Sequence, residues 1–315
     1  MIKSLLLHLS MNMWYDCAPE SLANLDPEQF RANYPHHFDR MPLYTRQLLW
    51  SDTLKTEDEV WRRVTAHFAE CGGNMLVIDL GDGVRYHSHP EIALKGAWSV
   101  SKLKDELARC RDLGLEVIPK LNFSSSHDAW MHEYSRMLST APYYRFCRDL
   151  ISEAAEIFDG PRFFHIGMDE ETYEDQCSEG HLYRIVRSGD LWWDDLAFYC
   201  DEVRRAGAQP WMWSDKYWAC SNDGNAAEFK ANVPTDVVIG NWYYKEAFEF
   251  TDETPEYLKK EKHRVDAYAG LDELGYDQIA TASNWAVKES YADTVEYCTR
   301  TITSGRLLGF MTAPW

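Results

Sequence analysis

The 315-residue sequence is short of positive charge: 32 Lys and Arg stand against 51 Asp and Glu, a net charge of −19. A nucleic acid or an anionic membrane surface would repel such a chain, so we expect neither as a partner. No apolar run approaches the roughly 18 residues of a membrane-spanning helix. The first apolar segment is also too short for a signal peptide and is interrupted by His8 and Asn12. We therefore expect a cytoplasmic protein.

Motifs of several catalytic classes are absent as well. There is no G-x-S-x-G sequence around a nucleophilic serine, and the eight cysteines form no C-x-x-C pair. Several cysteines occupy apolar positions of amphipathic segments, so we expect reduced core residues. His87 and His89 have the spacing of metal ligands but lie in a predicted loop without an evident third ligand. The sequence therefore predicts no metal and no other cofactor.

Short apolar segments alternate with long amphipathic segments, several of which end in glycine, as strands and helices do in α/β proteins. Strands are expected at residues 4–12, 74–80, 115–121, 163–167, 209–213, 237–242, 278–282 and 307–312, and helices at residues 56–71, 99–113, 143–158, 192–206, 226–231, 255–274 and 288–304. Eight such strands predict one α/β domain over residues 1–315, a (β/α)8 TIM barrel. The main alternative is an open doubly wound sheet, whose G-x-G-x-x-G sequence is absent.

Two features depart from a regular barrel. Residues 15–55 form a long loop between the first strand and the first helix, and loops of that length are usually functional. The eighth helix is missing, which would leave outward apolar side chains such as Leu308 and Phe310 uncovered. The helix at residues 288–304, the long loop or a second copy of the chain would have to cover them. Of these three we expect a homodimer.

The expected strand at residues 163–167 leads directly into three acids, Asp169, Glu170 and Glu171. Because side chains alternate along a strand, His165 and Asp169 should face the same side. Glu170 joins them only if the chain turns where the strand ends. Two neighbouring carboxyl groups repel each other's charge, which should raise one pKa and leave a proton donor beside an ionised partner. That pair suits glycosidic bond cleavage, although acids also favour the start of a helix.

Polar side chains and tryptophans gather at the C-terminal ends of the expected strands, where barrels of this kind assemble their active sites. The flat face of a tryptophan suits stacking on a sugar ring, although some of these rings would equally fit the barrel interior. We therefore expect a carbohydrate ligand. The residues at these ends include Asn12, Trp14, Asp79, Asp82, Lys120, Asn122, His127, His165, Trp213, Asp215, Trp242, Tyr243, Trp285 and Trp315.

The sequence H-I-G-M-D-E at residues 165–170 resembles the H-x-G-x-D-E motif of family 20 glycoside hydrolases, the β-N-acetylhexosaminidases. Residues 115–122 are similar to that family's third strand, which ends in I-P-E-hydrophobic-D, and His127 stands where the family has the histidine of a P-G-H segment. The W-S-D sequence at residues 213–215 resembles W-D-E after strand 5, and residues 309–315 resemble the eighth strand. Together these similarities extend from about residue 70 to the C-terminus.

The resemblance implies a retaining exo-glycosidase in which Glu170 is the general acid and base. Asp169 would orient the 2-acetamido group of the substrate, whose carbonyl oxygen attacks the anomeric carbon in place of an enzyme carboxylate. The residues that the resemblance places around this pair, to orient the carboxylates or to surround the acetamido group, are His127, His165, Trp213, Trp242 and Trp315.

The sequence departs from the family at positions that bind the sugar. The first strand has no arginine, the Y-L-D sequence after strand 7 is absent, and Lys120 and Asn122 replace two acids. Arg40 or Arg46 of the long loop is expected to replace the missing arginine. Two further functions stay open: a glycosidase for a sugar without an acetamido group and a non-catalytic carbohydrate-binding barrel. In the first of these, the nucleophile would be a protein carboxylate, Asp215 or Glu171.

Overall fold

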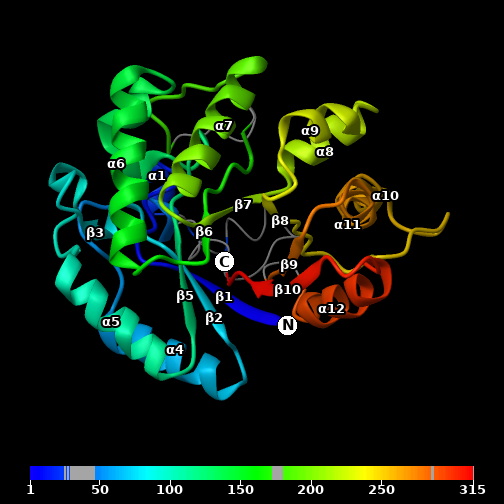
Figure 1. Cartoon of the computed structure of the whole chain (residues 1–315), viewed down its shortest axis with the longest axis horizontal. Coiled ribbons are helices and arrows are strands. Elements are labelled where there is room, and N and C mark those ends of the chain that lie inside the picture. The colour runs from blue at the N-terminus through cyan, green and yellow to red at the C-terminus, as the bar shows by residue number, and fades with distance from the viewer. Residues whose placement is uncertain (25, 27, 29–46, 172–179, 285–286, 315) are drawn as a thin grey trace.

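The computed structural model describes residues 1–24, 26, 28, 47–171, 180–284 and 287–314. Eight parallel strands close into a barrel, which confirms the predicted fold. In chain order they are β1 (Ile2–His8), β2 (Met75–Asp79), β5 (Glu116–Lys120), β6 (Phe163–His165), β7 (Gln209–Trp213), β8 (Val238–Gly240), β9 (Gln278–Ala282) and β10 (Leu307–Thr312). Each strand pairs with its neighbour in this order, and β10 pairs with β1, so that the two ends of the colour scale meet in Figure 1.

Helices surround the barrel (Figure 1). The longer ones are α4 (Asp58–Glu70), α5 (Val100–Asp112), α6 (Ala141–Ile157), α7 (Asp190–Arg205), α11 (Lys262–Leu274) and α12 (Ser290–Thr301). Shorter segments are α1 (Glu20–Ala23), α8 (Asp215–Asn222), α9 (Ala226–Asn232), α10 (Glu256–Lys259) and the 3-10 helices at Gly81–Gly83, Pro90–Ile92 and Ala129–Met137. A small parallel sheet of β3 (Val84–Arg85) and β4 (Trp98–Ser99) lies outside the barrel.

The barrel interior is apolar through most of its height. Leu6, Val77 and Ile118 point inward from neighbouring strands and pack together, whereas their strand neighbours Leu5 and Leu76 belong to the cluster between the barrel and the helices. This alternation is the period of two that a strand imposes on its side chains. Charged and imidazole side chains of the interior, among them Asp79, Lys120 and His165, lie at the C-terminal ends of the strands, where the candidate site lies.

The helix before the last strand covers that strand's outer face. α12 packs against both β9 and β10, and Phe310 is buried there beside Tyr291 and Cys298. The strip that we expected to be bare is thus covered at Phe310 by α12, the first of the three expected arrangements. Nothing in the fold tests the homodimer, which stays a prediction.

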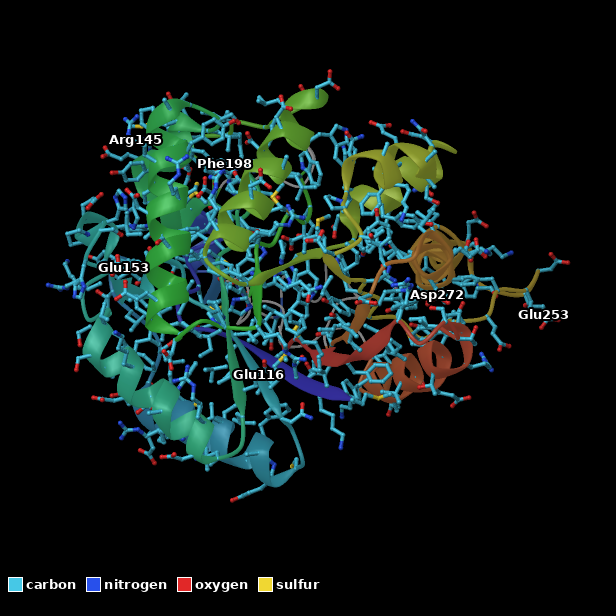
Figure 2. All side chains as sticks on the ribbon, viewed as in Figure 1. Glu116, Arg145, Glu153, Phe198, Glu253 and Asp272 are labelled. Atoms are coloured by element: carbon cyan, nitrogen blue, oxygen red, sulfur yellow. The ribbon has the colours of Figure 1, made fainter. Side chains whose placement is uncertain are left out.

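The outer surface is charged. Figure 2 shows side chains such as Arg145 on α6 and Glu253 before α10 projecting away from the helices, and both residues are exposed. Among the described residues, no helix combines the length and the apolar content that crossing a bilayer requires.

Closure of the barrel depends on a glycine in the last strand. Gly309 lies opposite Ile2 in the pairing of β10 with β1, and a Cβ atom there would overlap the carbonyl group of Ile2. We therefore expect Gly309→Ala to lower the free energy of unfolding by about 3 kcal/mol, because overpacking between two backbones has little room to relax. Urea denaturation followed by circular dichroism would measure the loss.

Gly224 provides the matched control. Its φ is +70° and nothing lies within 4 Å of the point where a Cβ atom would stand, so Gly224→Ala adds only backbone strain. That substitution should cost about 1 kcal/mol. Equal losses for the two variants would show that the closing contact between β1 and β10 tolerates a side chain.

Candidate active site

The two acids of the H-x-G-x-D-E sequence lie just beyond β6, in a tight turn. β6 ends at His165, and the following residues Gly167, Met168 and Glu170 have φ angles of +74°, +73° and +49°. These left-handed conformations are rare for residues other than glycine and cluster at functional sites. They end the strand earlier than predicted and turn Glu170 toward the same side as Asp169. No helix starts at these acids among the described residues; the next one, α7, begins at Asp190.

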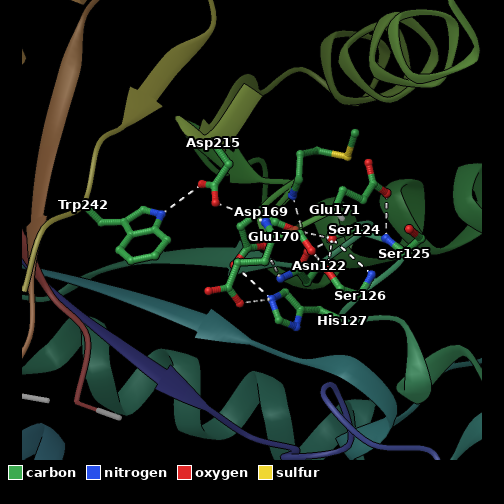
Figure 3. Close-up of polar contacts among 12 residues, drawn as sticks. Asn122, Ser124, Ser125, Ser126, His127, Asp169, Glu170, Glu171, Asp215 and Trp242 are labelled. Carbon is green, nitrogen blue, oxygen red and sulfur yellow. Dashed lines mark hydrogen bonds and ion pairs between the residues drawn. The ribbon is translucent and has the colours of Figure 1, made fainter. Parts of the chain in front are cut away.

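His127 joins the two acids. Its Nε2 atom lies 3.2 Å from Oδ2 of Asp169 and 3.1 Å from Oε2 of Glu170 (Figure 3). The ring is buried, and the partly exposed Trp14 meets it edge-on at 5.5 Å between ring centroids. One ring nitrogen of His127 thus contacts both carboxylates and fixes their positions.

Asn122 holds the other oxygen of Asp169. Its Nδ2 atom donates to Oδ1 of Asp169 at 2.9 Å. A side chain on Gly167 would overlap the amide group of Asn122, so the glycine of the motif is required by this contact as well as by its positive φ. Both oxygens of Asp169 therefore accept from a donor.

Two serines for which the sequence indicated no role hold the backbone of the acids. Ser124 donates from Oγ to the carbonyl oxygen of Asp169, and Ser126 donates to the carbonyl oxygens of both Asp169 and Glu170. The one available sequence signal is the run of three serines that directly precedes His127.

Asp215 and Trp242 form the opposite wall. Asp215, the first residue of α8, accepts the backbone N–H of Glu170 at 3.1 Å and the indole N–H of Trp242 at 2.9 Å (Figure 3). The guanidinium of Arg264 stacks on Trp242 at 4.2 Å and on Trp218 at 4.4 Å, which fixes the Trp242 ring. The acids therefore lie between an imidazole on one side and a carboxyl group with an aromatic wall on the other.

The surroundings of the site shift the pKa values of Asp169, His127 and Asp215. Burial disfavours the charge of Asp169, but the charge and hydrogen bond of His127 outweigh it, so the pKa of Asp169 is lowered. Burial likewise disfavours the charge of His127, yet the two acids raise its pKa to about 10. Burial and then the charges of Asp169 and Glu170 raise the pKa of Asp215 to about 8. The pKa of Asp215 is therefore raised, whereas that of Asp169 is lowered.

A polar layer lies beneath the acids. His8, Asp79, Lys120 and His165 occupy matching register positions on four neighbouring strands, β1, β2, β5 and β6. Lys120 donates to Asp79, and both are 1% exposed. His165 is fully buried with its ring centroid 4.5 Å from that of Trp213. Burial, followed by the charge of Lys120, lowers its pKa well below the usual value.

Several expected site residues lie elsewhere. His165 and Trp213 belong to the buried interior below the acids, and no hydrogen bond links His165 to either carboxylate among the described residues. Tyr243 is 1% exposed and packs edge-on against Phe248, behind the barrel wall. Its assignment to the substrate site stays a prediction. The remaining candidates Trp285, Trp315, Arg40 and Arg46 lie outside the described residues.

Glu171 points away from the acid pair. It accepts the backbone N–H of Ser125 at 2.7 Å and lies 2.6 Å from the guanidinium of Arg187, which also binds Asp195 at 2.9 Å. In Figure 3 its carboxylate is turned to the side opposite Asp215. The expectation that Glu171 could act as a nucleophile is wrong, because a buried arginine holds it in a separate network.

His127, Asp169 and Glu170 also offer ligand atoms that lie within 4.8 Å of one another, as metal ligands would. The raised pKa of His127 means that its own proton supplies positive charge between the carboxylates at neutral pH. The two histidines first considered as metal ligands contact acids of α6. His87 lies 3.9 Å from Glu153, and Nε2 of His89 lies 3.3 Å from Asp149. The donor set thus favours proton chemistry at the acids.

Comparisons with known proteins agree with this geometry at the level of the fold. No protein-family model and no curated protein sequence matches the chain. Solved structures do match. The β-N-acetylhexosaminidase of Bacteroides fragilis has 12% identity and a TM-score of 0.61, with all of this chain and 60% of that chain covered. The family 20 β-N-acetylhexosaminidase of Streptomyces coelicolor has 15% identity and a TM-score of 0.58, with 99% and 58% covered.

Dispersin B matches with 18% identity and a TM-score of 0.55, over 82% of this chain and 87% of that chain. The chain has the barrel fold of family 20 glycoside hydrolases. It spans about three-fifths of the length of the Bacteroides and Streptomyces proteins. At these identities the likeness concerns the fold, and what the site does has to be argued from its own residues.

The raised pKa of His127 makes a testable prediction. A histidine whose pKa is higher in the folded state than its ordinary 6.5 contributes stability that is complete below about pH 6.5 and is lost as the pH rises toward about 10. We therefore expect the difference in unfolding free energy between the wild type and His127→Gln to shrink between pH 6 and pH 10. Urea denaturation across this range would measure it.

The exposed His67 on α4 provides the control, because its ring is 75% exposed and lies outside the site. His67→Gln should follow the wild-type pH dependence throughout. Nitrogen NMR of the histidine rings offers a direct check: His127 should carry two ring protons at pH 8. A neutral His127 at that pH would contradict the assignment.

Proposed function

We propose that the chain is a glycoside hydrolase that removes β-linked N-acetylhexosamine residues by a retaining, substrate-assisted mechanism. The observation that carries the proposal is the His127 bridge, which holds Asp169 and Glu170 together at the C-terminal ends of the barrel strands. The partly exposed Trp14 and Trp242 beside these acids suit the flat face of a sugar ring.

In the first step, the carbonyl oxygen of the substrate's 2-acetamido group attacks the anomeric carbon. The bond to the leaving group breaks, and Glu170 gives its proton to the departing oxygen. The side chain of Glu170 is 38% exposed, so it is within reach of a bound ligand. Asp169 is suited to accept the acetamido N–H, because its lowered pKa keeps it ionised.

In the second step, water attacks the anomeric carbon of the resulting oxazolinium ion. Glu170, now a carboxylate, takes the proton from this water, and the acetamido group is released. The negative charge of Asp169 stabilises the positive charge of the ring throughout. Asp169 thus stabilises positive charge, and Glu170 alone transfers the proton.

A mechanism with a protein nucleophile is less well supported. The nucleophile would be Asp215, and an attacking carboxylate has to be ionised. Burial and the charges of Asp169 and Glu170 raise the pKa of Asp215 to about 8, and its oxygens already accept from Glu170 and Trp242. A thiazoline inhibitor, which mimics the oxazolinium ion, should therefore bind. Lack of binding would favour the mechanism with Asp215.

The general acid assignment predicts the effect of Glu170→Gln. This substitution keeps the size of the side chain but removes the transferable proton, so hydrolysis of poorly activated aryl N-acetylhexosaminides should fall by about 10²–10⁴-fold. Steady-state kinetics on a panel of aryl glycosides would measure the loss. Glu253→Gln, an exposed acid far along the chain, is the control and should leave kcat/KM unchanged. Absence of turnover in the wild type on every glycoside would favour a carbohydrate-binding barrel.

The role of Asp169 predicts a difference between substrates. Asp169→Asn should reduce kcat/KM for N-acetyl substrates far more than for their 2-hydroxy analogues, because only the former present an N–H to the carboxylate. Paired measurements on the two substrate types with the same leaving group would reveal this. Equal losses would favour a nucleophile supplied by the protein.

A further inference from the structure

The layer beneath the acids contains a fully buried ion pair that the proposed mechanism leaves without a task. The ammonium of Lys120 and the carboxylate of Asp79 are in contact, and each residue is 1% exposed. Buried ion pairs lose most of their hydration and add little net stability over an apolar pair. Stability is therefore a weak reason for a lysine inside the barrel, and its charge has to be considered in relation to the site above it.

Lys120 ends β5, and Asn122 follows two residues later. The side chain of Lys120 points into the barrel, on the same face as Ile118. Asn122 donates its amide to Oδ1 of Asp169. Lys120 lies in register with His165, the last residue of the strand that leads to Asp169. The end of β5 and the residues just after it thus supply a cation and, above it, a hydrogen-bond donor for the same acid.

The titratable groups of this layer and of the acids above it come from several elements. They are His8 on β1, Asp79 on β2, Lys120 on β5, His127 after β5, His165 on β6, the adjoining Glu170, and Asp215 at the start of α8. Burial lowers the pKa of His8 although Asp79 opposes this shift, and burial and the charge of Lys120 lower that of His165, so the charged form of both rings is disfavoured. His127 and Lys120 are therefore the cations of the set.

We propose that Lys120 is a positioning residue of the active site, whose buried charge, together with the amide of Asn122, keeps Asp169 an anion whatever the protonation state of Glu170. Asp79 keeps the ammonium in place from the far side. Asp169 then never competes with Glu170 for the catalytic proton, and its charge is permanent. The consequence for catalysis rests on the proposed function, whereas the charge state of Asp169 can be measured without any substrate.

The direct test is a pH titration of the aspartate carboxyl carbons by NMR, with Asp169→Asn to assign the resonance. In the wild type Asp169 should remain ionised at the lowest pH at which the protein stays folded. In Asp79→Asn/Lys120→Met, which removes the pair without stranding a buried charge, its titration midpoint should rise by about one pH unit. Lys120→Arg keeps the charge and should retain the wild-type behaviour.

The control is a second lysine–aspartate pair. Lys102 on α5 lies 2.6 Å from Asp58 on α4, and both are partly exposed. Asp58→Asn/Lys102→Met makes the same chemical change outside the barrel and should leave the midpoint of Asp169 unchanged. If the first double variant does not fold, Lys120→Gln keeps a donor for Asp79 and should shift the midpoint in the same direction.

Two outcomes would overturn the proposal. One is protonation of Asp169 in the wild type near its ordinary pKa of about 4. The other is an unchanged midpoint in a folded variant without the Lys120 charge, which would make the lysine structural. The acid limb of the kcat/KM profile should move with the NMR midpoint. If the wild type hydrolyses no glycoside while the NMR shifts are as expected, the proposed function fails and the assignment of Lys120 stands.

Discussion

One imidazole ring between two carboxylates is the interaction on which the site depends. Asp169 and Glu170 are adjacent in the sequence and both lie close to the closed, apolar part of the barrel, where like charges repel strongly. The proton shared through Nε2 of His127 turns that repulsion into attraction to a common cation. The left-handed turn that aims both acids the same way is tolerated because this attraction and the serine contacts hold it.

Around this centre, charge is distributed unevenly. Burial and the charges of Asp169 and Glu170 raise the pKa of Asp215. Asp169 has His127 on one oxygen and Asn122 on the other, and the charge of Lys120 also lowers its pKa. Asp215 and Asp169 thus differ in proton affinity, and the difference follows from where the cations are. This division is the physical basis of separate roles for neighbouring acids.

The fold was largely predictable from the sequence because its signals are local. Each of these signals spans only a short segment of the sequence: an apolar run of strand length, an amphipathic segment or a glycine at a helix end. The limits of β6 were missed, since Gly167 is in a left-handed conformation that its packing against Asn122 demands.

The site was harder to predict because its chemistry depends on contacts between distant segments. Adjacent acids suggest mutual repulsion, but the residue that relieves it, His127, is 42 positions before Asp169 in the sequence. Glu171 looks equivalent to its two neighbours until Arg187 is seen to bind it. Tyr243 likewise follows Trp242 in the sequence, and only the structure shows that it is buried beside Phe248.

The pairing of β1 with β10 has a consequence for how the chain acquires this site. The hydroxyl of Ser4 donates to the carbonyl of Phe310, a contact between residues 306 positions apart. Such a contact is among the last that a growing chain can make, and non-local pairings of this kind slow folding. Until β10 leaves the ribosome, β1 and β9 remain open edges that other strands can join. The nascent chain is therefore exposed to aggregation until the barrel closes.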